Sequence, residues 1–206
     1  MYARSTTFKD RPEAVDAGIA LVRDEVMPAV QRMEGCVGLS MLVDRESGSC
    51  IITSAWDSED ALRSSAPLVA PLRDRAQQLF GSRPEVQTWE IGVLHRAQAT
   101  AEGACARVTW TRMLREQIDA QLEAFRSAVL PQVEQLPGFC SVSLLVDRTT
   151  GRSALATVYE SRDALAESRQ AAMDLRTDAV RQMSSELLDV AEFEVALAHL
   201  RVPETV

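Results

Sequence analysis

The sequence predicts an α+β protein made of two ferredoxin-like βαββαβ repeats that together form one pseudo-dimeric α+β barrel. Three observations predict this fold: a long internal repeat, hydrophobic periodicity that switches between that of strands and that of helices, and strands with apolar residues on both faces. A chain of 206 residues is long enough to build one large core or two small ones.

The internal repeat emerges when the chain is aligned with itself. Residues 38–62 read GLSMLVDRESGSCIITSAWDSEDAL, and residues 141–165 read SVSLLVDRTTGRSALATVYESRDAL. Matched residues are 103 apart over most of each copy and 104 apart near its end. We expect repeat 1 to span residues 1–96 and repeat 2 to span residues 104–201, with a polar connector between them.

Each repeat begins with a strand and an amphipathic helix. Residues 2–8 and 105–111 read as short strands. Apolar residues then recur at three- and four-residue steps, which predicts one buried helix face: Val15, Ile19, Val22, Val26, Val30 and Met33. Pro28 and its match Pro131 lack an N–H, so each should kink the helix or end its regular hydrogen bonding.

A hairpin and a second helix follow. Alternate residues of 37–43 are apolar, residues 44–49 form a turn that begins with Asp and contains glycine, and the return strand ends at Trp56. Asp57 or Ser58 should cap the second helix.

The last strand is Trp89–His95 in repeat 1 and Phe193–His199 in repeat 2. One repeat should form a four-stranded antiparallel sheet with both helices on one face. Because the strands carry apolar residues on both sides, the sheet of the other repeat should cover the free face and close the barrel.

The second helices of the two repeats differ. Pro67 and Pro71 lie within that of repeat 1, whereas the helix of repeat 2 reads as continuous from Arg162. A helix broken at the prolines would open the mouth of a cavity near Trp56, and the alternative is a harmless local kink.

Composition restricts the partners. The chain has 22 basic and 30 acidic residues, a net charge of −8 that repels phosphate backbones and anionic lipid surfaces, so neither nucleic acid nor a membrane is an expected partner. It contains no apolar run of the ~20 residues needed to cross a bilayer. The N-terminus lacks the apolar stretch of a secretory signal, so a cytoplasmic location is expected.

The stretch LPGFCSVSLLVDRTTGRSALATVYES in repeat 2 resembles the antibiotic biosynthesis monooxygenase (ABM) family. Members are dimeric α+β barrels with Pro-Gly-Phe before the second strand and Trp-Glu-Ser after the third. Repeat 1 has Glu34-Gly35-Cys36 and Trp56-Asp57-Ser58 at these places. The resemblance implies either oxygenation of aromatic or quinone-like substrates without metal or flavin, or haem degradation. Neither a metal nor a cofactor is therefore expected.

The haem-degrading branch is a poor match. Its members use an Asn on the first strand, a Trp at the end of the third strand and a His on the second helix. This chain keeps Trp56 and has Tyr159 at the matched position, but it contains no Asn. The expected second helices, about 58–80 and 161–187, contain no His.

Nine residues are candidates for ligand binding: Trp56, Arg4, Thr6 and Ser40 in repeat 1, and Tyr159, Trp110, Arg107, Thr109 and Ser143 in repeat 2. Trp56 and Tyr159 could stack on a flat ligand, or each could fill the core at a strand end. No residue stands out as catalytic.

Arg4 and Arg107 begin the two repeats on matched strands and could hold an anionic or phenolic group. Alternatively, each could form a cross-strand ion pair with the glutamate kept on the last strand, Glu90 or Glu194. The two histidines, also at matched positions, lack the neighbouring carboxylates or thiols of a metal site.

Two functions remain open. The first is a site for a small apolar or aromatic molecule, with cofactor-independent oxygenation of an aromatic or quinone-like substrate as its chemistry. The second is a non-catalytic ligand-binding or assembly module that kept the barrel. A cavity with a polar group beside Trp56 or Tyr159 would favour the first, and a solid interior would favour the second.

Overall fold

The computed structural model describes residues 1–9 and 11–200, so residue 201, the expected end of repeat 2, lies outside the described residues. The chain divides into two compact units. Unit 1 holds Met1–Trp89 together with the part of the last strand from Val195, and unit 2 holds Glu90–Glu194.

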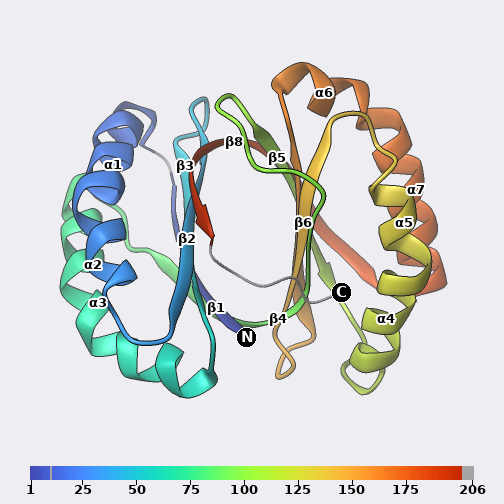
Figure 1. Cartoon of the computed structure of the whole chain (residues 1–206), viewed down its shortest axis with the longest axis horizontal. Helices are drawn as coiled ribbons and strands as arrows, with labels where there is room; N and C mark the ends of the chain where they lie inside the picture. The colour runs from blue at the N-terminus through green and yellow to red at the C-terminus, as the bar shows by residue number, and fades with distance from the viewer. Residues whose placement is uncertain (10, 201–206) are drawn as a thin grey trace. The chain divides into compact units, whose positions relative to one another are not determined.

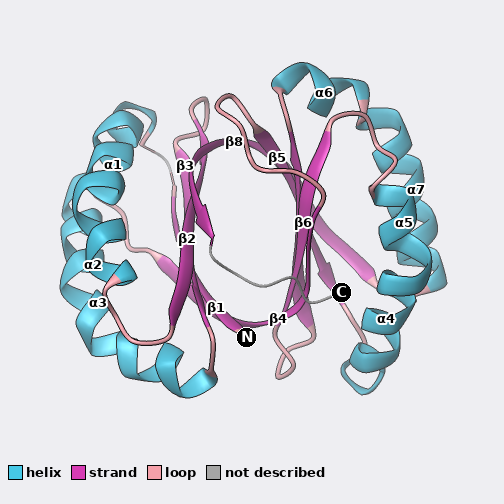
Figure 2. Cartoon of the chain, viewed as in Figure 1, coloured by secondary structure: helices cyan, strands magenta, loops and turns pink. Residues whose placement is uncertain are grey.

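Unit 1 is a sheet with helices on one face (Figures 1 and 2). Its elements are β1 (Tyr2–Phe8), α1 (Val15–Leu21), α2 (Met27–Gln31), β2 (Cys36–Asp44), β3 (Ser49–Trp56), α3 (Glu59–Phe80) and the first part of β4 (Glu85–Arg96). The central strand β3 pairs antiparallel with both β1 and β2, and this register places Arg4 opposite Ser54.

Unit 2 repeats this plan. Its elements are β5 (Cys105–Arg112), α4 (Ile118–Ala124), α5 (Leu130–Val133), β6 (Phe139–Val146), β7 (Arg152–Tyr159), α6 (Arg162–Glu167), α7 (Arg169–Gln182) and most of β8 (Glu186–Leu200). The sheet order is β8-β5-β7-β6-β4, because residues 90–96 of β4 pair antiparallel with β6. Residues 90–96 of repeat 1 therefore form a strand of the unit 2 sheet. They bond to the backbone N–H and C=O groups along the edge of β6 that would otherwise lack strand partners.

The predicted fold class is confirmed. Both repeats follow the order βαββαβ. Hydrogen-bonded neighbours run in the cyclic order of a closed barrel, β1-β3-β2-β8-β5-β7-β6-β4, and β4 and β8 are the strands whose residues are divided between the two units.

The predicted interruption of the first helix takes the form of a π-helical turn. Val22–Val26 form this turn just before Pro28, and Phe125–Val129 form it just before Pro131. Proline has no N–H and its ring crowds the carbonyl four residues earlier, so a widened turn lets the helix continue past it.

For the second helix of repeat 1 the structure shows the alternative in which the prolines do not break it, and the expectation of a continuous second helix in repeat 2 was wrong. In unit 1, α3 is one helix from Glu59 to Phe80, with Pro67 and Pro71 inside it. Both prolines lie on its exposed face, where water can satisfy the carbonyls that lose their partners. In unit 2 the helix is interrupted at Ser168, between α6 and α7.

Local signals in the hairpins and caps are confirmed. The Asp44 Oδ1 accepts a hydrogen bond from the N–H of Glu46, and Asp147 does the same for Thr149. Each aspartate thus closes the turn that it begins. The Ser58 Oγ accepts from the N–H of Ala61 and caps α3.

Each unit has its own apolar core between the sheet and the helices. In unit 1 the rings of Phe8 and Phe80 stack with centroids 4.6 Å apart, and Trp56 is fully buried. In unit 2 the core gathers around Phe125 and Tyr159. Among the helices of the described residues, none has both the length and the apolar character needed to cross a bilayer.

The continuous α3 leads to a testable expectation. Replacing Pro71 by Ala should restore a hydrogen bond inside the helix and raise the free energy of unfolding by about 1–3 kcal/mol, measured by urea denaturation. Pro84→Ala, in the loop before β4, is the matched control and should be neutral or slightly destabilising, since it only adds freedom to the unfolded chain. A neutral Pro71→Ala variant would contradict the unbroken helix.

Candidate functional site

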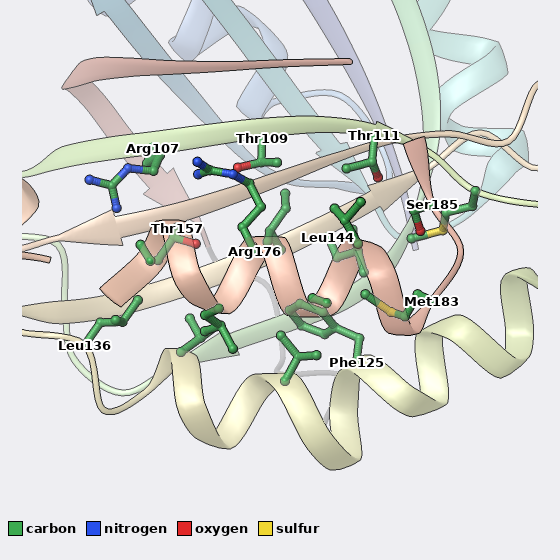
Figure 3. Close-up of a pocket in the computed structure, with 18 of the residues that line it drawn as sticks. Arg107, Thr109, Thr111, Phe125, Leu136, Leu144, Thr157, Arg176, Met183 and Ser185 are labelled. Carbon is green, nitrogen blue, oxygen red and sulfur yellow. The ribbon is translucent and has the colours of Figure 1, made fainter. Parts of the chain in front are cut away.

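Unit 2 contains a cavity of about 80 Å³ between its sheet and its helices (Figure 3). A buried water needs on the order of 10–15 Å³ by such a measure, so the cavity has room for several. Most of its wall is apolar, including Phe125, Leu144, Leu155, Leu175 and Met183. Its polar lining includes Arg107, Thr109, Thr157, Tyr159 and Arg176. Such a lining suits an apolar ligand with a few polar groups.

Arg107 organises the polar lining. Its side chain comes from β5 and is only 5% exposed. Nη1 donates to the Tyr159 hydroxyl at 3.0 Å and to Ser168 Oγ at 3.2 Å, and Nη2 donates to the Leu165 carbonyl at 2.8 Å. The guanidinium thus ties the first strand to the end of the third strand and to the interruption between α6 and α7.

Glu192 supplies the counter-charge. Its Oε1 accepts from Arg107 Nε at 3.2 Å and Nη2 at 3.0 Å, and its Oε2 accepts from Arg169 at 2.8 Å. Burial opposes ionisation of this carboxyl, but the two arginines outweigh it and lower the pKa of Glu192.

The cross-strand partner of Arg107 is therefore not the glutamate expected from the sequence. The register places Glu192 directly opposite Arg107, whereas Glu194 lies opposite Cys105. In repeat 1, Glu90 pairs with Arg148 rather than with Arg4.

Tyr159 and Arg176 complete the polar lining. Burial raises the pKa of the Tyr159 hydroxyl, against the opposing effect of Arg107, so this hydroxyl stays neutral near pH 7 and can donate a hydrogen bond. Arg176 reaches the cavity from α7, and burial together with the charge of Arg107 lowers its pKa. Two guanidinium groups near one cavity favour a ligand with negative charge or a strong acceptor.

Unit 1 has a smaller cavity, of about 50 Å³, at the matched place. Phe8 stands where repeat 2 has Thr111, and Phe80 stands where repeat 2 has Met183. The stacked pair of phenylalanine rings fills space that the smaller Thr111 and the flexible Met183 leave open.

In unit 1 the arginine of the first strand makes matching hydrogen bonds to the second helix. Arg4 Nη1 donates to Ser65 Oγ at 2.8 Å and Nη2 donates to the Leu62 carbonyl at 2.5 Å. Arg73, the match of Arg176, also lines this cavity, as do Thr6 and Ser54.

The predicted binding residues divide into two groups. Arg107, Thr109 and Tyr159 line the cavity of unit 2, and Arg4 and Thr6 line that of unit 1. The other candidates are absent from both linings: Trp56, Trp110, Ser40 and Ser143.

Strand geometry accounts for these absences. Side chains alternate across a strand, so Thr109 and Thr111 face the cavity while Trp110 faces the opposite side and meets Phe193 edge-on. Ser40 and Ser143 likewise neighbour cavity-facing residues on β2 and β6. Trp56 is fully buried, and its Nε1 donates to Ser54 Oγ at 3.1 Å.

The expected cavity mouth beside the prolines is also corrected. Pro67 and Pro71 lie on the exposed face of an unbroken α3, and of the two cavities lined by Arg4 and Arg107 the one in unit 2 is the larger.

Sequence reasoning missed the second arginine of each cavity and Glu192. A usable signal was present, because Arg73 and Arg176 are matched across the repeat at the same 103-residue offset, as are Ser65 and Ser168. No corresponding signal marked Glu192, which has no carboxylate at its matched position.

The histidines and cysteines of the described residues are not gathered into a metal site. Within residues 1–9 and 11–200, no group of three or more His, Cys, Asp or Glu side chains is placed to hold a metal ion. His95 lies against Phe139 and within 2.5 Å of Glu134. Burial raises the pKa of the Cys50 thiol to about 11, which keeps it protonated near pH 7.

Comparison with known proteins identifies the family. A sequence model of the family described as antibiotic biosynthesis monooxygenase (ABM) matches residues 1–66. Two uncharacterized proteins of Mycobacterium tuberculosis strain H37Rv match the whole chain: Rv2557 is 51% identical, with 92% of its length covered, and Rv2558 is 52% identical, with 88% covered. The chain belongs to the ABM family.

Solved structures support the fold of this ABM protein. A proposed monooxygenase of Fusobacterium nucleatum superposes with a TM-score of 0.69 at 14% identity, over 97% of this chain and 94% of its own. An anthrone oxidase-like protein superposes with a TM-score of 0.68 at 15% identity, over 99% of this chain and 94% of its own. At such identities the likeness shows the fold alone.

The ion pair at the polar lining predicts a dependence of stability on pH. Because the pKa of Glu192 is lowered by folding, its contribution is complete above the unfolded-state pKa of about 4.3 and is lost as pH falls through the lower folded value. Glu192→Gln should destabilise unit 2 by roughly 1–2 kcal/mol at pH 7, measured by urea denaturation.

The difference in unfolding free energy between wild type and Glu192→Gln should shrink as the pH is lowered below about 4. Glu186→Gln, at an exposed pair with Arg112, is the control and should change stability by less than about 1 kcal/mol. A Glu192→Gln cost that stays constant down to pH 3 would rule out the ionised pair as its cause.

Proposed function

We propose that the unit 2 cavity of this ABM protein binds a compact, aromatic or quinone-like molecule that carries one hydroxyl or anionic oxygen. The observation that carries the proposal is the lining itself, in which an apolar wall is combined with Arg107, Arg176 and the neutral hydroxyl of Tyr159. Flat apolar rings suit the wall formed by Phe125 and the aliphatic side chains. An oxygen of the ligand suits Arg176 and the Tyr159 hydroxyl, while Arg107, whose five N–H groups are all in use, adds only its positive charge.

The contacts of Arg107 support a preorganised site. The Tyr159 hydroxyl, Ser168 Oγ and the Leu165 carbonyl fix the guanidinium without a ligand, so binding costs little further ordering of this side chain. Glu192 already compensates part of its charge. The ligand group therefore needs no full negative charge, and a phenol or quinol oxygen is sufficient.

Cofactor-independent oxygenation is the second candidate, and one observation favours it. Two guanidinium groups beside an apolar wall stabilise a phenolate or enolate, and such an anion is the electron-rich form that can react with dioxygen directly. For a ring methylene beside a carbonyl-bearing system, reaction with one O₂ gives a new carbonyl and one water. The four electrons come from the methylene carbon.

Binding is tested by a substitution that fills the unit 2 cavity with the side chain found at the matched position of repeat 1. Thr111→Phe copies Phe8 at the matched position and should weaken binding of 1-naphthol at least about tenfold in isothermal titration calorimetry, since the added ring occupies the ligand volume. Leu114→Phe, at an exposed position, should leave the affinity within about twofold. Equal affinities of wild type and Thr111→Phe would refute binding in this cavity.

Catalysis is tested with anthrone, chosen because an anthrone oxidase-like protein shares the fold. Wild-type protein should consume one O₂ per anthrone above the buffer rate, measured with an oxygen electrode. Arg176→Met should lower the enzymatic rate at least about tenfold, because the enolate loses one of its two cations. Uptake no faster than in buffer would leave a binding protein and eliminate oxygenation of this substrate.

A further inference from the structure

The two repeats differ in the carboxylate that faces the buried arginine of the first strand. In repeat 2, Arg107 pairs with Glu192, which also pairs with Arg169. The residues matched to Glu192 and Arg169 in repeat 1 are Thr88 and Ala66. Repeat 1 therefore has the arginine but neither of the other two members of the ion-pair group.

Arg4 is left as a buried cation beside a second one. It is 6% exposed, and it lines the unit 1 cavity together with Arg73. In the part of the chain that the structure describes, neither arginine lies within ion-pair distance of a carboxylate. A buried charge without a counter-charge is costly, and burial together with Arg73 lowers the pKa of Arg4.

The cavity has hydrogen-bond donors to spare. Arg4 uses Nη1 and Nη2 for Ser65 Oγ and the Leu62 carbonyl, and a guanidinium carries five N–H groups. Thr6 also lines the cavity, and so does Ser54, whose Oγ already donates to the Arg4 carbonyl at 3.5 Å. These donors surround a volume of about 50 Å³, which limits any occupant to a few non-hydrogen atoms.

We propose that the unit 1 cavity binds a small aliphatic monocarboxylate, whose carboxylate pairs with Arg4 and Arg73 as the Glu192 carboxylate pairs with Arg107 in repeat 2. Its short tail would lie against the apolar residues of the lining, Val26, Val30, Leu39, Ile52, Val69 and Leu72. This site is separate from the aromatic site of unit 2, and it is specific for charge because a neutral molecule leaves the arginines uncompensated.

The first experiment compares butyrate with butyramide, which has the same shape and no charge. Isothermal titration calorimetry on the full chain should show one butyrate bound per chain. Butyramide should bind at least about tenfold more weakly, since charge-assisted hydrogen bonds to guanidinium are lost. Equal affinity for the two, or no binding of butyrate, would overturn the proposal.

A carboxylate restored at position 88 supplies the sharper test. Thr88→Glu places in repeat 1 the residue that repeat 2 carries, and its tethered carboxylate should weaken butyrate binding at least about tenfold by competing at high effective concentration. Thr88 is exposed, so the change should leave the fold intact. Thr88→Gln, matched in size and uncharged, should leave the affinity within about twofold. Unchanged butyrate affinity in Thr88→Glu would sink the proposal.

A variant whose unit 2 cavity is filled distinguishes butyrate binding in unit 1 from butyrate binding at the aromatic site of unit 2. In Thr111→Phe the butyrate affinity should equal that of the wild type within about twofold, because the cavity of unit 1 is untouched. Loss of butyrate binding in Thr111→Phe would place the anion in unit 2 and overturn the proposal, whatever the result with 1-naphthol.

Discussion

The architecture of both units depends on one buried arginine that crosses from the first strand to the second helix. Arg4 and Arg107 each donate to a serine hydroxyl and to a leucine carbonyl one turn earlier in that helix. A guanidinium can be buried only where acceptors satisfy it. These hydrogen bonds therefore fix the distance of the helix from the sheet. The cavity is the space beside these hydrogen bonds, and the buried arginine is part of its polar lining.

The two repeats share the hydrogen bonds from the buried arginine to the second helix, and they differ in the residues around those bonds. Two phenylalanines, Phe8 and Phe80, narrow the cavity of unit 1, whereas Thr111 and Met183 leave that of unit 2 wider. The carboxylate of Glu192 balances the charge of Arg107 in unit 2, and among the described residues Arg4 has no such partner in unit 1. The same backbone thus offers two chemically different interiors, a wider one with compensated charge and a narrower one with excess positive charge.

Much of the fold could be predicted because it is encoded locally. The repeat offset can be read directly from the sequence. The turn aspartates and the helix cap at Ser58 bond to residues two or three positions away, and all appear as expected. At Pro67 and Pro71 a broken helix and a harmless kink were both left open, because the exposure of a proline cannot be seen in the sequence, and the interruption in repeat 2 was not expected. The hydrogen bond from Arg107 to Ser168 has a counterpart from Arg4 to Ser65 inside the continuous α3, so it does not account for the interruption at Ser168, and no local sequence signal marks that position. Glu192 was missed for a similar reason, since strand register selects it over Glu194.

The division of β4 and β8 between the two units bears on how the chain loses its structure. Each of these strands is continuous, yet its residues belong partly to one compact unit and partly to the other. Loss of order in either strand therefore passes along the chain itself from residues of one unit to residues of the other.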